Sequence, residues 1–253
     1  KDEPIKEKDI NEDDCITLRN IGIGSVFRVD LIYHINKGKL YAKKVQHIPS
    51  SEMLKLFFRE INNYMNMKHP FLPMFYCSNE VKHYYIIEFI NGKTLSNINE
   101  LNLTENEKMT ILFELMITID YLHHKKYVIR DLKPNNVMID ENKTAVIIDF
   151  DRMINLNDIS DNQIFTSDFQ SYYTANELKE GNFSYEKCDV YSFGMLLCYI
   201  MTEKVPNDPE SIKYHDLSDM CKMCIDKIPE KRPTLSNLII EFFINHYNQI
   251  QNN

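Results

Sequence analysis

The sequence predicts an α+β protein in which a small antiparallel β-sheet precedes a larger, mostly helical part. Strand-like alternation of apolar residues runs from Ile16 to Val45 and is interrupted by the hairpin signal Asn36-Lys37-Gly38. Further along, apolar residues recur at helical spacing from Leu112 to Leu122. A chain of 253 residues, 43% of them hydrophobic, is long enough to bury the core of one large domain or of two lobes.

The composition excludes several classes of protein. The net charge is -8 and no long basic run is present, so we expect no nucleic-acid partner. The longest apolar stretch, Met109 to Ile119, is interrupted by Glu114, and we expect no membrane span within this segment. Six scattered cysteines, four of them in apolar or helical patterns, indicate a reduced, cytoplasmic or cytoplasm-facing chain. Cys221-x-x-Cys224 lacks a second ligand pair, which favours a buried helix face over a metal site.

The N-terminal segment is highly charged. Residues 1–14 alternate acids and lysines with little apolar content, so we expect a mobile or loosely docked lead-in, with order beginning near Cys15. Beyond it, Gly22 and Gly24 lie two residues apart between strand-like runs. A glycine-rich hairpin lets backbone N–H groups approach phosphates without a Cβ in the way, and this turn is therefore a candidate phosphate-binding loop.

Two helices are predicted by capping residues and apolar spacing. One begins at Ser50 and Ser51, because apolar residues follow at near-helical spacing as far as Met65. The other begins at the capping box Thr104-Glu105-Asn106-Glu107 and ends with two histidines. Because cationic side chains suit the C-terminal end of a helix dipole, we interpret His123 and His124 as structural.

The densest group of candidate functional residues lies between Val128 and Asp151. Its first aspartate is followed by a lysine two residues later and an asparagine five residues later, and its second follows a strand-like run. Mg²⁺ takes carboxylate and amide oxygens, lysine neutralises phosphate, and a separate aspartate can orient or deprotonate an attacking hydroxyl. The pattern therefore indicates phosphate and metal chemistry at Asp131, Lys133, Asn136 and Asp149.

These motifs resemble those of the protein kinase superfamily. Asp131-Leu132-Lys133-Pro134-Asn135-Asn136 is similar to its catalytic loop, and Asp149-Phe150-Asp151 is similar to its Asp-Phe-Gly metal motif. Gly22-x-Gly24, with Val29 five residues later and Ala42-x-Lys44 on the next strand, resembles the glycine-rich loop and the lysine-bearing strand of these enzymes. The resemblance extends from Cys15 to about Tyr247.

The resemblance implies a bilobal kinase fold. Its N-lobe, residues 15–90, would hold the small antiparallel sheet and helix C, and its C-lobe, residues 91–253, would be mostly helical. Only fourteen residues, Glu203 to Asp216, separate two late helical regions and they contain two prolines, so we expect helix G to be shortened or missing. Because the chain begins at Lys1 rather than Met, we also expect it to be part of a longer signalling protein.

The resemblance further implies transfer of the γ-phosphoryl of Mg-ATP to a hydroxyl of a protein substrate. Lys44, paired with Glu60 of helix C, would grip the α- and β-phosphates; the alternative, a solvated Glu60, stays open because Glu52 is also available. Asp131 would orient the hydroxyl and Lys133 would neutralise the moving phosphoryl. Mg²⁺ would be held by Asn136 and Asp149.

The resemblance also assigns the remaining nucleotide contacts. Ile87 would be the gatekeeper, the backbone of Glu88 and Ile90 would read adenine, and Thr94 would approach the ribose. The other implied ATP-binding positions are Gly22, Gly24, Val29, Ala42 and Met138.

Structural and regulatory roles follow from later motifs. Asp189 would hold the catalytic-loop backbone, and Arg232 would pair with Glu177 of the Ala-Asn-Glu segment. Arg130, before the catalytic aspartate, is typical of members switched by phosphate on the activation segment, which Thr166 would carry. Ser167, Ser171 and Tyr172 are alternative phosphate acceptors.

Four departures from the family motifs keep a second hypothesis open. Phe27 replaces the third glycine, Ile129 the catalytic-loop histidine, Asp151 the glycine after the metal aspartate, and Asn176 a proline. Because Phe27 replaces a glycine, we expect the tip of the glycine-rich turn to be stiffer and bulkier than usual. They favour a pseudokinase that binds nucleotide and acts as a signalling scaffold, whereas the complete set of catalytic residues favours an enzyme. Lys133 suggests Ser/Thr specificity, whereas Gln170 occupies the place where Ser/Thr members of the family usually carry a threonine. The wording of the late motifs is closest to the tyrosine-kinase-like group. Phosphorylation of a small molecule is disfavoured by the Ala-Asn-Glu and Arg232 elements.

Overall fold

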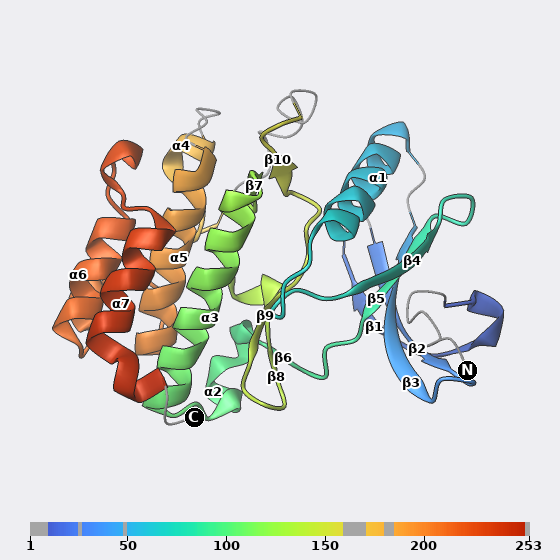
Figure 1. The fold of residues 1–253 in the computed structure, drawn as a ribbon, viewed down its shortest axis with the longest axis horizontal. Helices are drawn as coiled ribbons and strands as arrows, with labels where there is room; N and C mark the ends of the chain where they lie inside the picture. Colours follow the sequence, from blue (N-terminus) through green and yellow to red (C-terminus); the bar gives the residue numbers. More distant parts are fainter. Residues whose placement is uncertain (1–9, 25–26, 48–49, 159–170, 180–184, 251–253) are drawn as a thin grey trace, which may run out of the picture. The chain divides into compact units, whose positions relative to one another are not determined.

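The computed structural model describes residues 10–24, 27–47, 50–158, 171–179 and 185–250, and the chain divides into two compact units, Lys1–Asn91 and Gly92–Asn253. The first unit contains an antiparallel sheet and one α-helix, and the second is mostly helical (Figure 1). The predicted α+β class, with a β-rich part before a helical part, is confirmed.

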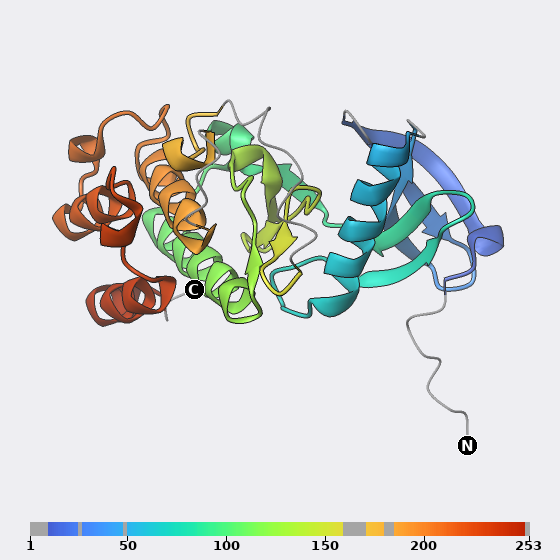
Figure 2. The same cartoon turned by 90° about the horizontal axis from the view of Figure 1, so that it is seen from above.

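The first unit is built on a five-stranded sheet in the order β1-β2-β3-β5-β4. Helix α1 (Ser51–Asn66) lies along the sheet (Figure 2), and the Ser50 hydroxyl caps it by accepting from Met53 N at 3.2 Å. Met65, expected on the apolar face, is 58% exposed because the buried face ends at Tyr64. The strands are β1 (Cys15–Ile23), β2 (Phe27–His34), β3 (Lys39–Gln46), β4 (Phe75–Asn79) and β5 (Tyr84–Glu88).

The structure differs from the expectation that order begins near Cys15. Ile10 is only 7% exposed and belongs to the hydrophobic cluster of the first unit, and the short helix η1 (Glu12–Asp14) follows it. Asn11 caps η1, since its side chain accepts from Asp13 N. The composition of residues 1–14 did not reveal this docking, because a single isoleucine and a single acid provide it.

In the second unit, α3 (Glu105–His124) packs against α5 (Tyr185–Thr202) and α7 (Leu235–Ile250). The predicted capping box is present at Thr104 and Glu107, and eleven residues of α3 are buried, which makes it the central helix of this unit. The other α-helices are α2 (Ile98–Leu101), α4 (Asn176–Lys179) and α6 (His215–Cys224).

Two small sheets carry the loops that hold the candidate site of the second unit. One joins β6 (Gly92–Thr94), β8 (Val137–Asp140) and β9 (Ala145–Ile147), and the other pairs β7 (Tyr127–Val128) with β10 (Ile154–Asn155). Both sheets are antiparallel. Three short 3-10 turns lie beside them or later in the chain: η2 (Leu95–Asn97), η3 (Pro134–Asn136) and η6 (Pro229–Lys231).

The segment between α5 and α6, residues 203–214, contains only the 3-10 turn η5 (Pro209–Ser211) and no α-helix. The expectation that helix G is shortened or missing between α5 and α6 is therefore confirmed. Cys221 and Cys224 of α6 are both fully buried and lie on the core side of the helix. Within the described ranges, none of the helices combines the length and apolar content that a membrane span requires.

Candidate active site

In the first unit, the strand register places the predicted nucleotide-contacting residues on one sheet surface. Gly22 of β1 lies opposite Val29 of β2, which lies opposite Lys44 of β3. Ala42, two residues before Lys44, shares its face and lies opposite Ile87 of β5. Residues distant in sequence thus form a contiguous surface.

Lys44 is held between a carboxylate and aromatic rings. Its Nζ lies 2.7 Å from Glu60 Oε1 of α1, and the Glu60 side chain is fully buried. The Nζ also lies 4.8 Å from the centroid of Phe27 and 5.7 Å from that of Tyr85. The structure therefore brings Lys44 together with Glu60, the acid that the resemblance indicated.

Phe27 was expected to make the tip of the glycine-rich turn bulky. Instead it begins β2 and is only 5% exposed, with its ring 6.4 Å from Phe57 and 6.2 Å from Tyr85. The side chain points into the unit because apolar residues of α1 and β5 form a pocket for it. The expectation about the tip is therefore wrong, and the ring contacts Lys44 instead.

The turn between β1 and β2 has a support that the motifs did not reveal. Asn20 Nδ2 donates to Gly22 O at 3.2 Å, to Val29 O at 3.0 Å and to Asp30 Oδ1 at 3.2 Å. Arg28 pairs with the other oxygen of Asp30 at 3.0 Å. These bonds fix the base of the hairpin on both strands. Asn20 has no signal in the sequence, because asparagine in a strand is more often a turn or surface residue.

The predicted adenine-contacting segment is partly occupied by bonds within the first unit. Glu88 N donates to Met74 O at 2.8 Å, and the Glu88 carboxylate accepts from Met74 N at 3.2 Å. The Glu88 N–H is therefore engaged, so a backbone contact between Glu88 and adenine would have to use its carbonyl. Ile90, beyond the end of β5, is half-buried, and Gly24 is exposed at the hairpin turn.

The second unit brings together two further predicted nucleotide contacts. Thr94 of β6 lies opposite Met138 of β8 in the antiparallel pair, and both are half-buried. The Thr94 hydroxyl lies 2.6 Å from the Ser96 hydroxyl. Residues 44 positions apart in sequence thus lie side by side on one small sheet.

Asp131 is fixed by hydrogen bonds to one of its two carboxylate oxygens. Lys133 Nζ donates to Asp131 Oδ2 at 2.7 Å, and Asn136 Nδ2 donates to the same oxygen at 3.1 Å and to Asp131 O at 2.9 Å. Arg152 Nε lies 3.9 Å from Oδ2. Among the described residues, no hydrogen bond or ion pair reaches Oδ1, which leaves this oxygen for an incoming hydroxyl.

Asn136 and Asp149 are suited to a hard cation. Because Asn136 Nδ2 donates to Asp131, its Oδ1 remains as a neutral oxygen donor, and Ile148 N donates to Asn136 O at 2.9 Å just before Asp149. No group of three His, Cys, Asp or Glu side chains within the described ranges is placed to hold a metal alone. Mg²⁺ bound with phosphate usually keeps water and needs one or two protein oxygens, so this pair fits it.

Two of the non-glycine residues with positive φ in this unit lie beside the candidate site. Arg130 and Asp149 both have positive φ, 64° and 69°. Asp151, which replaces the motif's glycine, does not, so the backbone places no requirement for glycine there. Within this motif, Asp149 is the residue that adopts the left-handed conformation.

Asp189 of α5 organises the catalytic loop. Its carboxylate accepts from Ile129 N and from Arg130 N, both at 2.8 Å, and it is fully buried. His123 Nε2 lies 2.9 Å from the same carboxylate. His123 therefore joins the predicted structural group, a role that its position at the end of a helix did not reveal.

Two more predicted residues meet in the second unit. Arg232 forms a bidentate pair with Glu177, in which Nη1 reaches Oε1 and Nη2 lies 3.1 Å from Oε2. Arg232 also donates from Nε to Asp226 O at 2.8 Å and from Nη1 to Lys187 O at 2.9 Å. The pair ties α4 to the start of α5 and to the turn η6.

Only some of the residues expected to regulate the domain lie within the described residues. Arg130 is buried and donates from Nε to Arg152 O at 2.8 Å. Tyr172 is 70% exposed, and Ser171 accepts from Tyr173 N through its hydroxyl. Thr166 and Ser167 lie outside the described residues, and so does Gln170.

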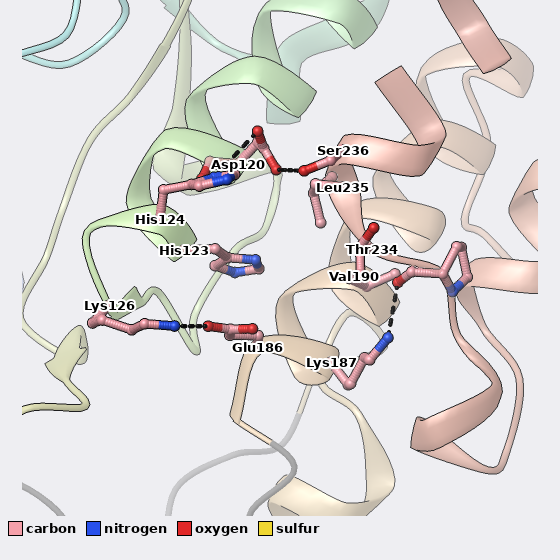
Figure 3. A pocket seen from close by; sticks show the side chains of 11 residues that line it. Asp120, His123, His124, Lys126, Glu186, Lys187, Val190, Thr234, Leu235 and Ser236 are labelled. Carbon is pink, nitrogen blue, oxygen red and sulfur yellow. Dashed lines mark hydrogen bonds and ion pairs between the residues drawn. The ribbon is translucent and has the colours of Figure 1, made fainter. Parts of the chain in front are cut away.

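A cavity of about 210 Å³ in the second unit is lined by none of the predicted catalytic, nucleotide-binding or metal-binding residues (Figure 3). Its walls come from the end of α3 and the starts of α5 and α7. Its polar groups have partners within the protein: Ser236 Oγ donates to Asp120 Oδ1 at 2.7 Å, and Lys126 Nζ lies 3.6 Å from Glu186 Oε1. Lys187 donates to Pro233 O at 3.2 Å. The cavity presents paired polar groups and shows no sign of a ligand site.

The fold and these groups of residues define a protein kinase domain. The family model described as protein kinase domain matches residues 16–249, and the chain belongs to this family.

Curated relatives carry kinase names. The chain is 28% identical over 202 residues to carbon catabolite-derepressing protein kinase of Candida glabrata, covering 77% of this chain and 33% of that protein. It is 33% identical over 155 residues to serine/threonine-protein kinase sgk-1 of Caenorhabditis elegans, covering 58% and 34%. It is 26% identical over 201 residues to serine/threonine-protein kinase PrkC of Bacillus subtilis, covering 77% and 31%. The chain thus spans about a third of the length of these relatives.

Proposed function

We propose that this domain transfers the γ-phosphoryl group of Mg-ATP to a serine or threonine hydroxyl of a protein substrate. The names of two relatives support this acceptor, as does Lys133 in the catalytic loop. The substrate oxygen attacks the γ-phosphorus, the bond to the β–γ bridging oxygen breaks, and Asp131 receives the hydroxyl proton. Asn136 and Asp149 would hold Mg²⁺, which would supply positive charge to neutralise the phosphates.

The main observation that supports this proposal is the way hydrogen bonds orient the Asp131 carboxylate. One oxygen, Oδ2, is held by Lys133 and Asn136, so the carboxylate cannot rotate freely. The other oxygen is left for the acceptor, and the side chain is 12% exposed. A group that is oriented and partly open is what proton acceptance requires.

The alternative is a pseudokinase that binds nucleotide and acts as a scaffold. It is favoured by the Phe27 ring at 4.8 Å from Lys44 Nζ, because phosphate and the ring would approach the same ammonium group. It is opposed by the presence of Lys44, Glu60, Asp131, Asn136 and Asp149 together.

Measuring phosphoryl transfer by an Asp131→Asn variant distinguishes the kinase from the scaffold. The enzyme proposal expects the variant to bind Mg-ATP like the unaltered chain and to transfer phosphate about 10²- to 10⁴-fold more slowly. Glu210→Gln is the matched control, because Glu210 is 74% exposed and pairs only with Lys222 within the described residues. If the unaltered chain binds Mg-ATP but labels no protein substrate, the scaffold function replaces the enzyme.

We also propose that the chain is part of a longer signalling protein. We propose that it lies in the cytoplasm, or that it is the cytoplasm-facing domain of that longer protein. The share of each relative that the chain covers supports the first statement. Six free thiols support a reducing compartment. An immunoblot of the native protein after cell fractionation tests both statements. The size of the detected band tests whether the protein is longer, and the fraction that contains it tests its compartment.

A further inference from the structure

The segment before β1 is attached to the first unit by two side chains, Ile10 and Glu12, which we call the N-terminal clamp. Ile10 is buried in a cluster with residues of β2, β3, β4 and β5, and its carbonyl accepts from Cys77 Sγ at 3.4 Å. Glu12 uses its two oxygens for two different lysines: Oε1 bonds Lys43, and Oε2 lies 2.7 Å from Lys82. The clamp therefore connects the start of β1 to β3 and to the β4–β5 turn.

The contacts of Glu12 favour the ionised form of its carboxyl group. Burial raises the pKa of its carboxyl, but hydrogen bonds from Lys43, Lys82 and Tyr84 outweigh burial and lower the pKa to about 2. Lys43 also lies 4.2 Å from the centroid of the Tyr84 ring. Glu12 is thus ionised throughout the physiological pH range, and its contacts with Lys43 persist there.

Lys43 and Lys44 are consecutive residues of β3, so their side chains point to opposite faces of the sheet. Glu12 holds Lys43 on one face, and Glu60 holds Lys44 on the other. A strand fixed by a carboxylate on each face has little freedom to rotate about its axis. The position of the Lys44 ammonium therefore depends on both acids.

In the part of the chain that the structure describes, β1 is an edge strand paired with β2 alone, and this pairing is interrupted by two register shifts between Thr17 and Gly22. Asn20 of β1 adds side-chain hydrogen bonds to Val29 O and Asp30 Oδ1 of β2. Most of its residues are exposed. The clamp is continuous with the first residue of β1, and Ile35 N donates to Asp14 O at 2.9 Å. The clamp thus supports the strand that leads to the glycine-rich turn.

We propose that Glu12 is a positioning residue for nucleotide binding, acting through Lys43 on the strand that carries Lys44 and through β1 on the glycine-rich turn. This inference rests on the proposed function, since it takes Lys44 to contact ATP. It places control of nucleotide affinity in a segment that precedes the first strand of the kinase family fold.

The test uses the full chain with Glu12→Gln, which removes the charge and keeps the size. Glu80→Gln is the control, because Glu80 is an exposed acid in the same β4–β5 turn as Lys82. Glu12→Gln is expected to raise KM for Mg-ATP about three- to tenfold while kcat stays within about twofold, because a loss of ground-state binding appears in KM. Glu12→Asp, which keeps the charge, is expected to restore most of the affinity.

Amide hydrogen exchange gives a second readout that does not need ATP. Exchange at Lys43, Lys44 and Val45 is expected to be faster in Glu12→Gln than in Glu80→Gln. A lower melting temperature with unchanged KM would show a merely structural role and overturn the inference. If the unaltered chain binds no Mg-ATP, the proposed function fails and Glu12 has no nucleotide to position; exchange then shows only whether the clamp holds β3.

Discussion

Lys44 and Glu60 form an ion pair that is almost completely withdrawn from water: their side chains are 8% and 0% exposed, with Nζ 2.7 Å from Oε1. Removing only one partner of such a pair leaves a buried charge without compensation and costs about 3–5 kcal/mol. The stability of the first unit therefore depends on Lys44 and Glu60, the two residues that would position phosphate under the proposed function.

The pair predicts that stability and activity separate in a double variant. Lys44→Met leaves Glu60 buried and uncompensated, so the melting temperature should fall by about 10 °C. Lys44→Met with Glu60→Leu replaces both charges by apolar groups and should recover more than half of that loss. Neither variant should transfer phosphate. Calorimetry and a phosphoryl-transfer assay check this, and a Lys44→Met protein as stable as the unaltered chain would contradict it.

Phe27 predicts a change in nucleotide affinity. Its ring attracts the Lys44 ammonium from 4.8 Å, an interaction worth about 0.5–2 kcal/mol, and phosphate must approach the same group. Phe27→Leu keeps an apolar side chain against Phe57 but removes the aromatic face, so KM for Mg-ATP should fall about threefold. Phe27→Tyr, which keeps the ring, is the control and should bind ATP like the unaltered chain. Weaker binding by Phe27→Leu would show that the ring assists nucleotide binding.

Motif spacing and the family resemblance indicated the candidate site residues and several of their partners, whereas contacts that no motif encodes could not be predicted. Asp131, Lys133 and Asn136 lie in one short loop, so their relative positions follow from local sequence. The inward side chain of Phe27 depends on Phe57 and Tyr85, which belong to other elements.

The clamp was missed for the same physical reason. Glu12 meets lysines that lie 31 and 70 positions further along the chain, and composition identifies Glu12 only as one acid among many. His123 likewise acquires its role only because α5 brings the Asp189 carboxylate to it. Such partners become evident when the sheet order and helix packing are known.

From the contacts of Arg232 we expect that lysine cannot replace it without a loss of stability. Its guanidinium is 1% exposed and donates to both Glu177 oxygens and to two backbone carbonyls, which an ammonium group cannot match. Arg232→Lys should destabilise the second unit by about 2–3 kcal/mol. Chemical denaturation measures this, with Lys231→Arg at the neighbouring exposed position as the control. A loss below about 0.5 kcal/mol would mean that the bidentate geometry contributes little.

Glu114 predicts a dependence of stability on pH near neutrality. Burial raises the pKa of this carboxyl to about 7, although the Ala145 N–H, 2.7 Å from Oε2, partly offsets the effect. The folded chain therefore holds this proton more tightly than the unfolded chain, in which the pKa is about 4.5. Stability should fall as the pH rises from about 4.5 to 7 and then stay level, by about 3 kcal/mol in total from this group.

Glu114→Gln tests this directly, because glutamine resembles the protonated acid and its carbonyl can still accept from Ala145 N. The variant should match the unaltered chain at pH 4.5 and exceed its stability by about 2–3 kcal/mol at pH 8, measured by urea denaturation. Glu230→Gln, at an exposed acid of the same unit, should show no such pH-dependent gain. Since Ala145 begins the strand that leads to Asp149, the gain should be accompanied by slower amide exchange in β9 at pH 8. An equal stability of Glu114→Gln and the unaltered chain at both pH values would mean that Glu114 is ionised in the folded protein at little cost.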